Sequence, residues 1–402
     1  MTSMTKHTLE DCFSLRARIG WQGLRSEEFK TEGPYLVTGT DFHNGRVDWD
    51  DCYHVTEERY AQDKGIQLRE HDLLITKDGT IGKTAVVIDC PEKVTLNSGV
   101  FVVRAINNEV IPEFLHYILH SYWFDEFVRN VLTGSTIKHL NQEKFYKFTF
   151  EAPDVQTQKN IVKVLTAIDD VRDRTRELID KYVALMKGFV QDQLTSQITD
   201  EATVKLGTFA DALGGKRVPK GSELTIAHTT HPYIRVRDMT KPKTVELTDD
   251  FLYVEEQDFH KISRYIVDAG DLIISIVGTV GAVALVGESL DKASLTENCS
   301  KIVHIRGYIP EFLYYYLSSE YGQREIQKKT VGEVQAKLPL KNILDIKVPV
   351  LTEDEQRDLI EKFRSIDEEI EQETTFYLKM ENIRSGLLKD LLSGMIAVPA
   401  QM

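Results

Sequence analysis

The sequence has few cysteines, no long hydrophobic run and no excess of positive charge. Four cysteines occur among 402 residues, and no two of them form a C-x-x-C pair. A zinc ribbon or a disulfide scaffold is therefore not indicated, and four separate thiols are typical of a reducing cytoplasm. No stretch of about 18 apolar residues occurs, so no membrane span is predicted. The first residues contain no apolar segment of the kind that a secretory signal needs.

The balance of charge argues against one simple function. The formal net charge is −14, which disfavours an independent, tight and non-specific binder of nucleic acid. With 42% hydrophobic residues, the chain is too apolar to be disordered. Its length allows two to four domains with real hydrophobic cores.

The most informative feature is an internal duplication. The run IPEFL occupies residues 111–115 and returns at 309–313, and the turn G-T-(I/V)-G occupies residues 79–82 and returns at 278–281. Further matches keep the same order and an offset of 198 or 199 residues, including Gln158 with Gln356. This period is far too long for a solenoid. The sequence therefore predicts two homologous copies, each about half of the chain.

Each copy begins with mixed secondary structure. Short β-branched runs bounded by glycine or charged turns predict strands, and a helix is expected after each IPEF motif because proline suits the first helical turn. The predicted fold class is α+β: two homologous mixed domains joined by two long antiparallel helices with pseudo-twofold symmetry. The runs that predict strands are 71–76, 84–89 and 99–106 in copy one, and 271–278, 282–287 and 300–305 in copy two.

Each copy ends in a long helical segment with apolar residues spaced alternately by four and three positions. This pattern is typical of a coiled coil, and about 40 residues would form a rod of roughly 60 Å. Arg172, Thr175 and Glu373 interrupt the seam, and Gly188 and Gly386 are expected to weaken or bend the rods. Two amphipathic helices inside one globular core are the alternative. The residues expected to pack between the helices are Ile161, Leu165, Ile168, Ile179, Tyr182 and Phe189 in the first, and Leu359, Phe363, Ile366, Ile370, Tyr377, Met380 and Leu387 in the second.

Signals for catalysis or for a metal are weak. Gly82-Lys83-Thr84 resembles the end of a phosphate-binding loop, but Lys77 stands where that motif needs glycine, and a tight turn between strands is the simpler reading. His116 and His120 have a metal-ligand spacing without a completing carboxylate. No nucleophile elbow, methyltransferase tetrapeptide or glycine-rich cofactor loop is present. We therefore expect no catalytic residue, no metal and no cofactor in this chain.

The order of these elements resembles the specificity (S) subunits of type I restriction-modification systems, over nearly the whole chain. Two features depart from the family pattern: Thr157-Gln158 stands where Glu-Gln is usual, and Gly332-Glu333 stands in place of a Gly-Ser/Thr loop. The elements that carry the resemblance are Pro34-Tyr35, the segment 232–234, the strand 270–275 with its turn 278–281, the loop 133–136, the step 348–350 into Glu355-Gln356, and the closing segment 385–394.

The resemblance implies a division of labour. Residues 1–153 and 200–351 would be target recognition domains, and residues 154–199 and 352–402 would be helical spacers that set the distance between two half-sites of an asymmetric DNA sequence. The expected partners are double-stranded DNA and two methyltransferase subunits, which would carry S-adenosylmethionine, and a translocating nuclease subunit can join them. The expected location is the cytoplasm, with no membrane contact. The acidic runs 169–173 and 368–371 would face protein or solvent.

Candidate DNA-binding residues are those with forked donors, cations or hydroxyls in loops and turns, because base edges and phosphates need such groups. For each of them, an ordinary surface salt bridge is the competing interpretation. Arg235 and Arg237 are expected to alternate on a strand and so to share one face. The set comprises Asn44, Arg46, Lys77, Asp78, Lys83, Ser135, Thr136, Lys138 and His139 in copy one, and Lys216, Arg217, Lys220, Arg235, Arg237, Gln335 and Lys337 in copy two.

Two other functional classes remain open from the sequence. One is a protein-binding scaffold assembled through the coiled coil. The other is a self-contained DNA methyltransferase or nuclease, against which the missing motifs argue.

Overall fold

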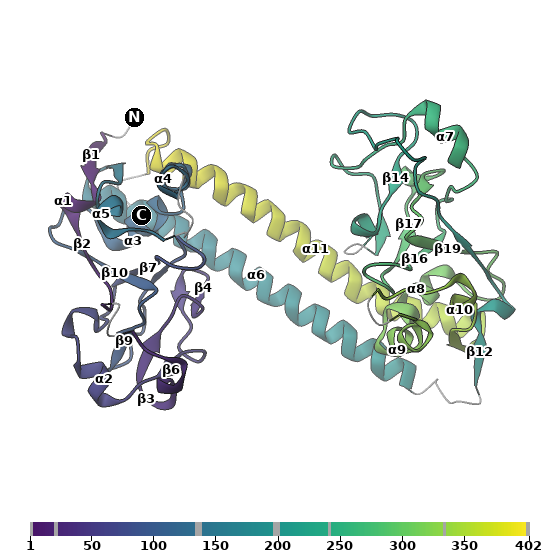
Figure 1. Ribbon diagram of the computed structural model, residues 1–402, viewed down its shortest axis with the longest axis horizontal. Helices are drawn as coiled ribbons and strands as arrows, with labels where there is room; N and C mark the ends of the chain where they lie inside the picture. Colours follow the sequence, from purple (N-terminus) through teal and green to yellow (C-terminus); the bar gives the residue numbers. More distant parts are fainter. Residues whose placement is uncertain are drawn as a thin grey trace. The chain divides into compact units, whose positions relative to one another are not determined.

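The structure is a computed structural model that describes residues 3–19, 23–132, 139–195, 202–239, 243–332 and 335–398. The chain divides into two compact units. The first is Met1–Glu177 with Thr374–Met402, and the second is Leu178–Glu373. The two long helices, α6 (Val155–Thr195) and α11 (Glu353–Leu392), each begin in one unit and end in the other (Figure 1). Each unit therefore contains one copy of the repeat together with part of both helices.

The first unit is built around a six-stranded sheet with the order β2-β10-β7-β8-β5-β4. Successive side chains of a strand point to opposite faces, so Leu73 and Ile75 pack in one hydrophobic cluster and Leu74 packs in another. Both faces are covered, which explains the uninterrupted apolar run of this strand. The strands are β2 (Phe13–Arg16), β10 (Val100–Ala105), β7 (Leu73–Thr76), β8 (Thr84–Val86), β5 (Arg46–Val47) and β4 (Phe42–His43).

The second unit repeats this design with a five-stranded sheet of order β13-β19-β16-β17-β15. Leu272 and Ile274 face one cluster and Ile273 faces another, as their counterparts do in the first unit. The strands are β13 (Asp211–Gly214), β19 (Cys299–Val303), β16 (Leu272–Ser275), β17 (Val283–Val286) and β15 (Thr244–Val245). The six runs that predicted strands are thus confirmed as β7, β8, β10, β16, β17 and β19.

Smaller elements complete each unit. Both predicted IPEF helices are present, with proline at the first position of α3 and of α8. None of the helices in the described ranges combines the length and the hydropathy that a membrane span requires. The remaining strands are β1 (Thr5–Thr8) with β11 (Thr149–Ala152), β6 (Tyr53–His54) with β3 (Lys30–Val37) and β9 (Val94–Leu96), β12 (Thr203–Lys205) with β20 (Lys347–Pro349), and β14 (Tyr233–Ile234) with β18 (Ser294–Leu295). The shorter helices are α1 (Leu9–Cys12), α2 (Glu57–Ala61), α3 (Pro112–Ile118), α4 (Tyr122–Leu132), α5 (Gln142–Tyr146), α7 (Glu256–Ile262), α8 (Pro310–Ser318), α9 (Glu320–Lys329) and α10 (Leu340–Leu344).

The two long helices start with different caps. At α11, the Thr352 hydroxyl accepts from the Glu355 amide while the Glu355 carboxylate accepts from the Thr352 amide, which is a capping box. At α6, the Asp154 carboxylate accepts from the amides of Gln156 and Thr157. Copy one therefore keeps a satisfied helix start although it lacks the glutamate of the family pattern. Both helices continue through Gly188 and Gly386.

Burial along the long helices follows the four-three spacing. In α6, Ile161, Leu165 and Ile179 are buried, and in α11 Leu359 and Phe363 are buried. The outer ends also enter the globular cores: the start of α6 and the end of α11 belong to one hydrophobic cluster in the first unit, and the opposite ends share a cluster in the second. The other predicted seam residues are half-buried, namely Ile168, Tyr182, Phe189, Ile366, Ile370, Tyr377, Met380 and Leu387.

A buried glutamine fastens each long helix to its own unit. The Gln158 side-chain oxygen accepts from the Ile111 amide at 3.0 Å, and its nitrogen donates to the carbonyls of Glu109 and Pro153. Gln356 repeats all three bonds with the Ile309 amide and two carbonyls, 198 residues later. Both glutamines are fully buried. We call these two sets of bonds the glutamine clamps.

Loss of a clamp should destabilise its unit. In Gln158→Ala, a buried amide and two buried carbonyls lose their partner, and each such loss costs about 1–3 kcal/mol. We expect unfolding of the first unit to become easier by about 2–4 kcal/mol in denaturant titrations. Gln156→Ala is the matched control, because Gln156 lies on the same turn and is exposed. Equal effects of the two substitutions would contradict the clamp.

Candidate nucleic-acid interface

The glycine turn after the central strand is closed by a hydroxyl in both copies. The Thr76 hydroxyl accepts from the Lys83 amide at 3.0 Å and donates to the Thr80 carbonyl. Ser275 makes the same two bonds with Ala282 and Thr279. The last two amides of each turn are thus used internally, and glycines with positive φ allow the tight path. The structure supports the turn interpretation over a phosphate-binding loop.

A second loop lies beside each turn. The Leu140 amide donates to the Lys77 carbonyl, and the Leu338 amide donates to the Ile276 carbonyl, in equivalent positions of the two copies. The segments before Leu140 and before Leu338 are the polar loops chosen from the sequence. Each copy therefore places the residue that directly follows its polar loop beside its glycine turn, at one edge of its main sheet.

In copy one this edge collects four of the predicted residues. Asp78 is hydrogen-bonded to His139 and forms an ion pair with Lys77, whose ammonium also lies 5.6 Å from the centre of the Phe101 ring. Lys77 is largely buried, and Lys83 is exposed on the turn. Among the described residues, this edge presents the exposed Lys83 ammonium and the hydrogen-bonded Asp78 and His139 side chains to solvent. The predicted residues of the same loop that lie outside the described ranges are Ser135, Thr136 and Lys138.

In copy two the corresponding edge holds Gln335 and Lys337, both exposed. Lys337 and Val331 exchange two backbone hydrogen bonds, which close the loop around Gly332. Arg217 also lies at this edge, where it forms an ion pair with Glu297. The carbonyl of the next residue, Asn298, accepts from the Ile276 amide. Copy two therefore offers different donors from copy one at an equivalent place.

The other basic residues of copy two have mixed surroundings. The Lys216 ammonium lies 5.8 Å from the centre of the Tyr265 ring. Lys220 lines a cleft whose other charged residues are Glu223, Glu255 and Asp258. An acidic cleft disfavours a nucleic-acid phosphate, so the position of Lys220 is less suited to this contact than that of Arg217.

The expected strand under Arg235 and Arg237 is wrong. β14 ends at Ile234, and residues 236–239 form a 3₁₀ turn. The Asp238 carboxylate accepts from both the backbone and the guanidinium of Arg235, so it turns the chain away from the sheet. The two arginines therefore do not share a face as predicted. Arg235 is 16% exposed, whereas Arg237 is 63% exposed and pairs with Asp250.

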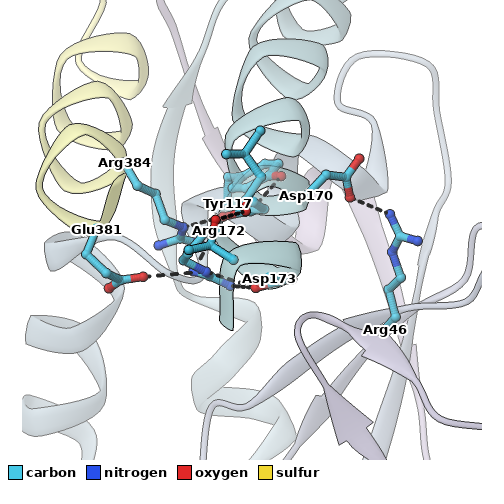
Figure 2. Close-up of polar contacts among 10 residues, drawn as sticks. Arg46, Tyr117, Asp170, Arg172, Asp173, Glu381 and Arg384 are labelled. Carbon is cyan, nitrogen blue, oxygen red and sulfur yellow. Dashed lines mark hydrogen bonds and ion pairs between the residues drawn. The ribbon is translucent and has the colours of Figure 1, made fainter. Parts of the chain in front are cut away.

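Asn44 and Arg46 lie apart from the glycine turn. Asn44 and Gly45 both have positive φ and form the two-residue hairpin between β4 and β5. Arg46 then points to α6, where its guanidinium lies 3.2 Å from the Asp170 carboxylate (Figure 2). This pair links the sheet to the long helix in the first unit.

A polar layer joins the two long helices within the first unit (Figure 2). Arg384 of α11 binds the Asp169 carboxylate of α6, and Arg172 of α6 lies 3.4 Å from Glu381 of α11. The partner of Arg172, three residues after Asp169 in α6, lies three residues before Arg384 in α11. The two helices therefore run antiparallel here. Tyr117 of α3 donates to the same Asp169 carboxylate at 3.1 Å. We call this set the polar layer.

Sequence reasoning missed the polar layer. Arg172 was expected to interrupt the seam and Asp169 to face protein or solvent, yet the Asp169 side chain is only 15% exposed. Burial raises the pKa of the neighbouring Asp173 above the ordinary carboxyl value although Arg172 opposes the shift. A signal was present in the sequence, because Tyr117 and Asp169 are each repeated 198 residues later as Tyr315 and Asp367.

The second unit satisfies the equivalent aspartate differently. Tyr315 donates to Asp367, as Tyr117 does to Asp169, but the cation is Lys243, whose ammonium lies 3.2 Å from Asp367. Lys243 also binds Glu311. Burial alone would raise the pKa of Glu311, but its hydrogen-bonded ion pairs with Arg364 and Lys243 hold that pKa below its ordinary value. The equivalent carboxylate is therefore paired with a cation of α11 in the first unit and with a cation from the segment before β15 in the second.

The histidine pair of copy one faces inward. A nitrogen of each ring, His116 Nδ1 and His120 Nε2, lies 2.9 and 3.2 Å from the Thr84 hydroxyl. Burial lowers the pKa of His116 well below its ordinary value and that of His120 to about 4. Both rings are therefore neutral near pH 7, and the Thr84 hydroxyl lies within hydrogen-bond distance of both.

Removing the cation of the polar layer should destabilise the first unit. Arg384→Met introduces the residue that copy two carries at the equivalent position, Met186. The largely buried Asp169 carboxylate then keeps Tyr117 and a 3.5 Å contact with Arg172, so we expect a loss of about 1–3 kcal/mol. Adding Asp169→Leu should recover part of that loss in a double-mutant cycle measured by chemical denaturation. Lys362→Ala, which breaks an exposed pair on the same helix, should change stability by less than about 1 kcal/mol. Strictly additive effects of the Arg384 and Asp169 substitutions would contradict the layer.

Comparison with known proteins gives the family. Residues 6–181 and 199–379 each match the family model described as "Type I restriction modification DNA specificity domain". These two matches cover most of the chain. The chain therefore belongs to this family and carries two copies of its domain.

Relatives and solved structures agree with this assignment. The "Type I restriction enzyme MjaVIII specificity subunit" of Methanocaldococcus jannaschii is 24% identical over 355 residues, covering 83% of this chain and 81% of that protein. The "Type I restriction enzyme EcoBI specificity subunit" of Escherichia coli is 22% identical over 331 residues, covering 75% and 68%. A crystal structure of a type I restriction-modification S subunit from M. genitalium has the same fold, with a TM-score of 0.61 at 16% identity over 97% of this chain and 96% of that one. The predicted family and fold class are confirmed, and the family match supports recognition of DNA without catalysis.

Proposed function

We propose that this chain is the non-catalytic subunit that recognises the DNA sequence for a type I restriction-modification complex. The duplication carries this proposal. Each copy ends its central strand in the same hydroxyl-closed turn, and each turn borders a loop with different side chains. Two similar recognition domains with different side chains at their edges suit an asymmetric DNA site made of two half-sites. We call each recognition domain a reader. Reading cellular DNA places this function in the cytoplasm.

We assign one half-site to each copy. Residues 1–153 form the first reader, with Lys83, Asp78 and His139 at its exposed edge. Residues 200–351 form the second reader, with Arg217 and the loop 335–337 at its edge. Phosphate contacts position such an edge, and donors and acceptors at base edges supply the sequence preference. Ser135, Thr136 and Lys138 belong to the first set by their place in the sequence.

Some predicted residues suit structural roles better. Arg235 is held by the buried carboxylate of Asp238, and releasing it to DNA would leave that charge without a partner. Lys77 is largely buried over Phe101. Arg46 is exposed, and its ion pair with Asp170 joins β5 to α6. We therefore rank the exposed residues Lys83, Arg217, Arg237 and Lys337 above Arg235 and Lys77.

The acidic charge of the chain requires partners. A protein of formal net charge −14 is a poor match for DNA phosphates by itself, so we propose that two methyltransferase subunits supply much of the phosphate binding and carry S-adenosylmethionine. Large apolar side chains on the outer sides of the long helices support docking there. In the first unit these are Val171, Phe376, Leu378 and Ile383. A translocating nuclease subunit completes the complex where restriction accompanies modification.

The test uses the full chain bound to its methyltransferase subunits. Selection from random duplexes should return a bipartite asymmetric motif. Arg237→Ala should relax base preference in one half only, and Lys83→Ala in the other half only, by about 1–3 kcal/mol, or roughly 5- to 150-fold. Arg357→Ala, an exposed change on α11, should leave both halves intact.

Three results would overturn parts of this proposal. Selection that returns no motif would indicate a protein-binding scaffold. Weakening that is uniform across all sequences would identify the substituted residue as a phosphate contact, and so remove it from the base-reading set. Turnover of S-adenosylmethionine by the chain without partners would favour an enzyme.

A further inference from the structure

Three side chains with metal-binding atoms converge in the first unit, away from the proposed DNA edge. They are His7 on β1, Cys12 at the end of α1 and Glu109 in the loop between β10 and α3. The His7 Nδ1 atom lies 3.5 Å from the Cys12 sulfur and 3.5 Å from a Glu109 carboxylate oxygen. All three ligand atoms lie within 4.8 Å of one another.

The separation between His7 and Glu109 fits a shared ion better than a direct hydrogen bond, and the 3.5 Å between the Cys12 sulfur and His7 Nδ1 is compatible with a sulfur hydrogen bond as well as with an ion. A nitrogen and a carboxylate oxygen in a hydrogen bond lie about 2.7–3.2 Å apart, so 3.5 Å between His7 and Glu109 is too long. In a tetrahedral zinc site, ligands at about 2.0–2.1 Å for nitrogen or oxygen and about 2.3 Å for sulfur are separated by about 3.3–3.6 Å. The two measured distances therefore match the edges of such a tetrahedron.

The backbone around the three residues is fixed without an ion. The Ile106 amide donates to the Cys12 carbonyl, and the Asn107 side chain donates to the Asp11 carbonyl. The carbonyl of Glu109 accepts from Gln158, so the glutamine clamp holds this loop. A site with its ligands already positioned loses little entropy when the ion binds.

The surroundings also suit an ion that keeps one open position. Cys12 is fully buried, whereas the Glu109 side chain is 61% exposed. The thiol therefore lies at the inner end and the carboxylate at the outer end, where an ion can enter and water can supply a fourth ligand. The His7 ring is braced against Phe150.

Copy two offers an internal comparison, because its equivalent positions carry no ligands. Val204 pairs with Val348 as His7 pairs with Phe150, and Gly307 accepts from Gln356 as Glu109 does from Gln158. The Phe209 carbonyl accepts from Arg306 as that of Cys12 does from Ile106. The ligand set belongs to copy one alone, so the shared fold does not require it.

We propose that His7, Cys12 and Glu109 bind one divalent transition-metal ion, with zinc as the occupant. Mixed nitrogen, sulfur and oxygen ligands suit this borderline ion. Binding forms the metal–sulfur bond in place of the thiol S–H bond, and the proton leaves to solvent. The ion would tie the first strand and α1 to the loop before α3, a stabilising role separate from DNA recognition.

The test is metal titration of the full chain after chelator treatment, with Co²⁺ as the spectroscopic probe for zinc. We expect one equivalent of Co²⁺ to give a thiolate-to-metal charge-transfer band that Zn²⁺ abolishes. Cys12→Ser should lose the band, and Cys90→Ser, which changes a thiol outside the cluster, should keep it. Zinc should raise the melting temperature of the wild type and of Cys90→Ser but not of Cys12→Ser.

Substitutions of the other two proposed ligands control for a folding defect. His7→Gln and Glu109→Gln leave the buried thiol in place and should weaken Co²⁺ binding by about tenfold or more. The group His43, Asp48 and Asp51 contains no thiol, but the Cys52 sulfur lies 3.2 Å from the Asp48 carbonyl, so Cys52→Ser is a second control that should keep the band. Absence of the band in the wild type, or its persistence in Cys12→Ser, would overturn the proposal. None of these readouts involves DNA, so their failure would leave the proposed function untouched.

Discussion

The two glutamine clamps are the constraint on which the rest of the structure depends. A buried amide must have its donors and acceptor paired, and Gln158 can pair only if the start of α6 lies against the residues that precede α3. The same holds for Gln356 with α11 and α8. Each reader is thereby fixed to the first turn of its own long helix. The edge that carries the glycine turn and the polar loop is left free to vary.

The copies diverge where the clamps do not constrain them. Asp169 and Asp367 occupy equivalent positions and accept from equivalent tyrosines, yet Arg384 neutralises the first and Lys243 helps to neutralise the second. The two copies thus share a fold but neutralise the equivalent, partly buried carboxylate with cations from different segments. The same freedom at the loop edges is what an asymmetric DNA target requires, because two identical readers would favour a symmetric site.

Local sequence patterns predicted the secondary structure and the repeat, but they could not predict which distant side chains pair. The strands, the IPEF helices and the long helices follow from periodicity and from the repeat itself. Asp169 and Arg384 are 215 residues apart, so their pairing, and with it the polar role of Arg172, could not be seen from spacing. The strand expected under Arg235 failed because Asp238 captures that residue and turns the chain. His7, Cys12 and Glu109 form no motif along the sequence and have no counterpart in copy two.

We propose that the paired helices hold two different recognition domains at a set distance. Removing residues 175–181 from α6 and 372–378 from α11 takes out facing turns around Arg176 and Tyr377, which pair. The methylated motif of cells that carry this variant with its partner subunits measures the outcome. We expect unchanged bases in both halves and a spacer shorter by one to about three base pairs. An unchanged spacer with full modification would contradict it.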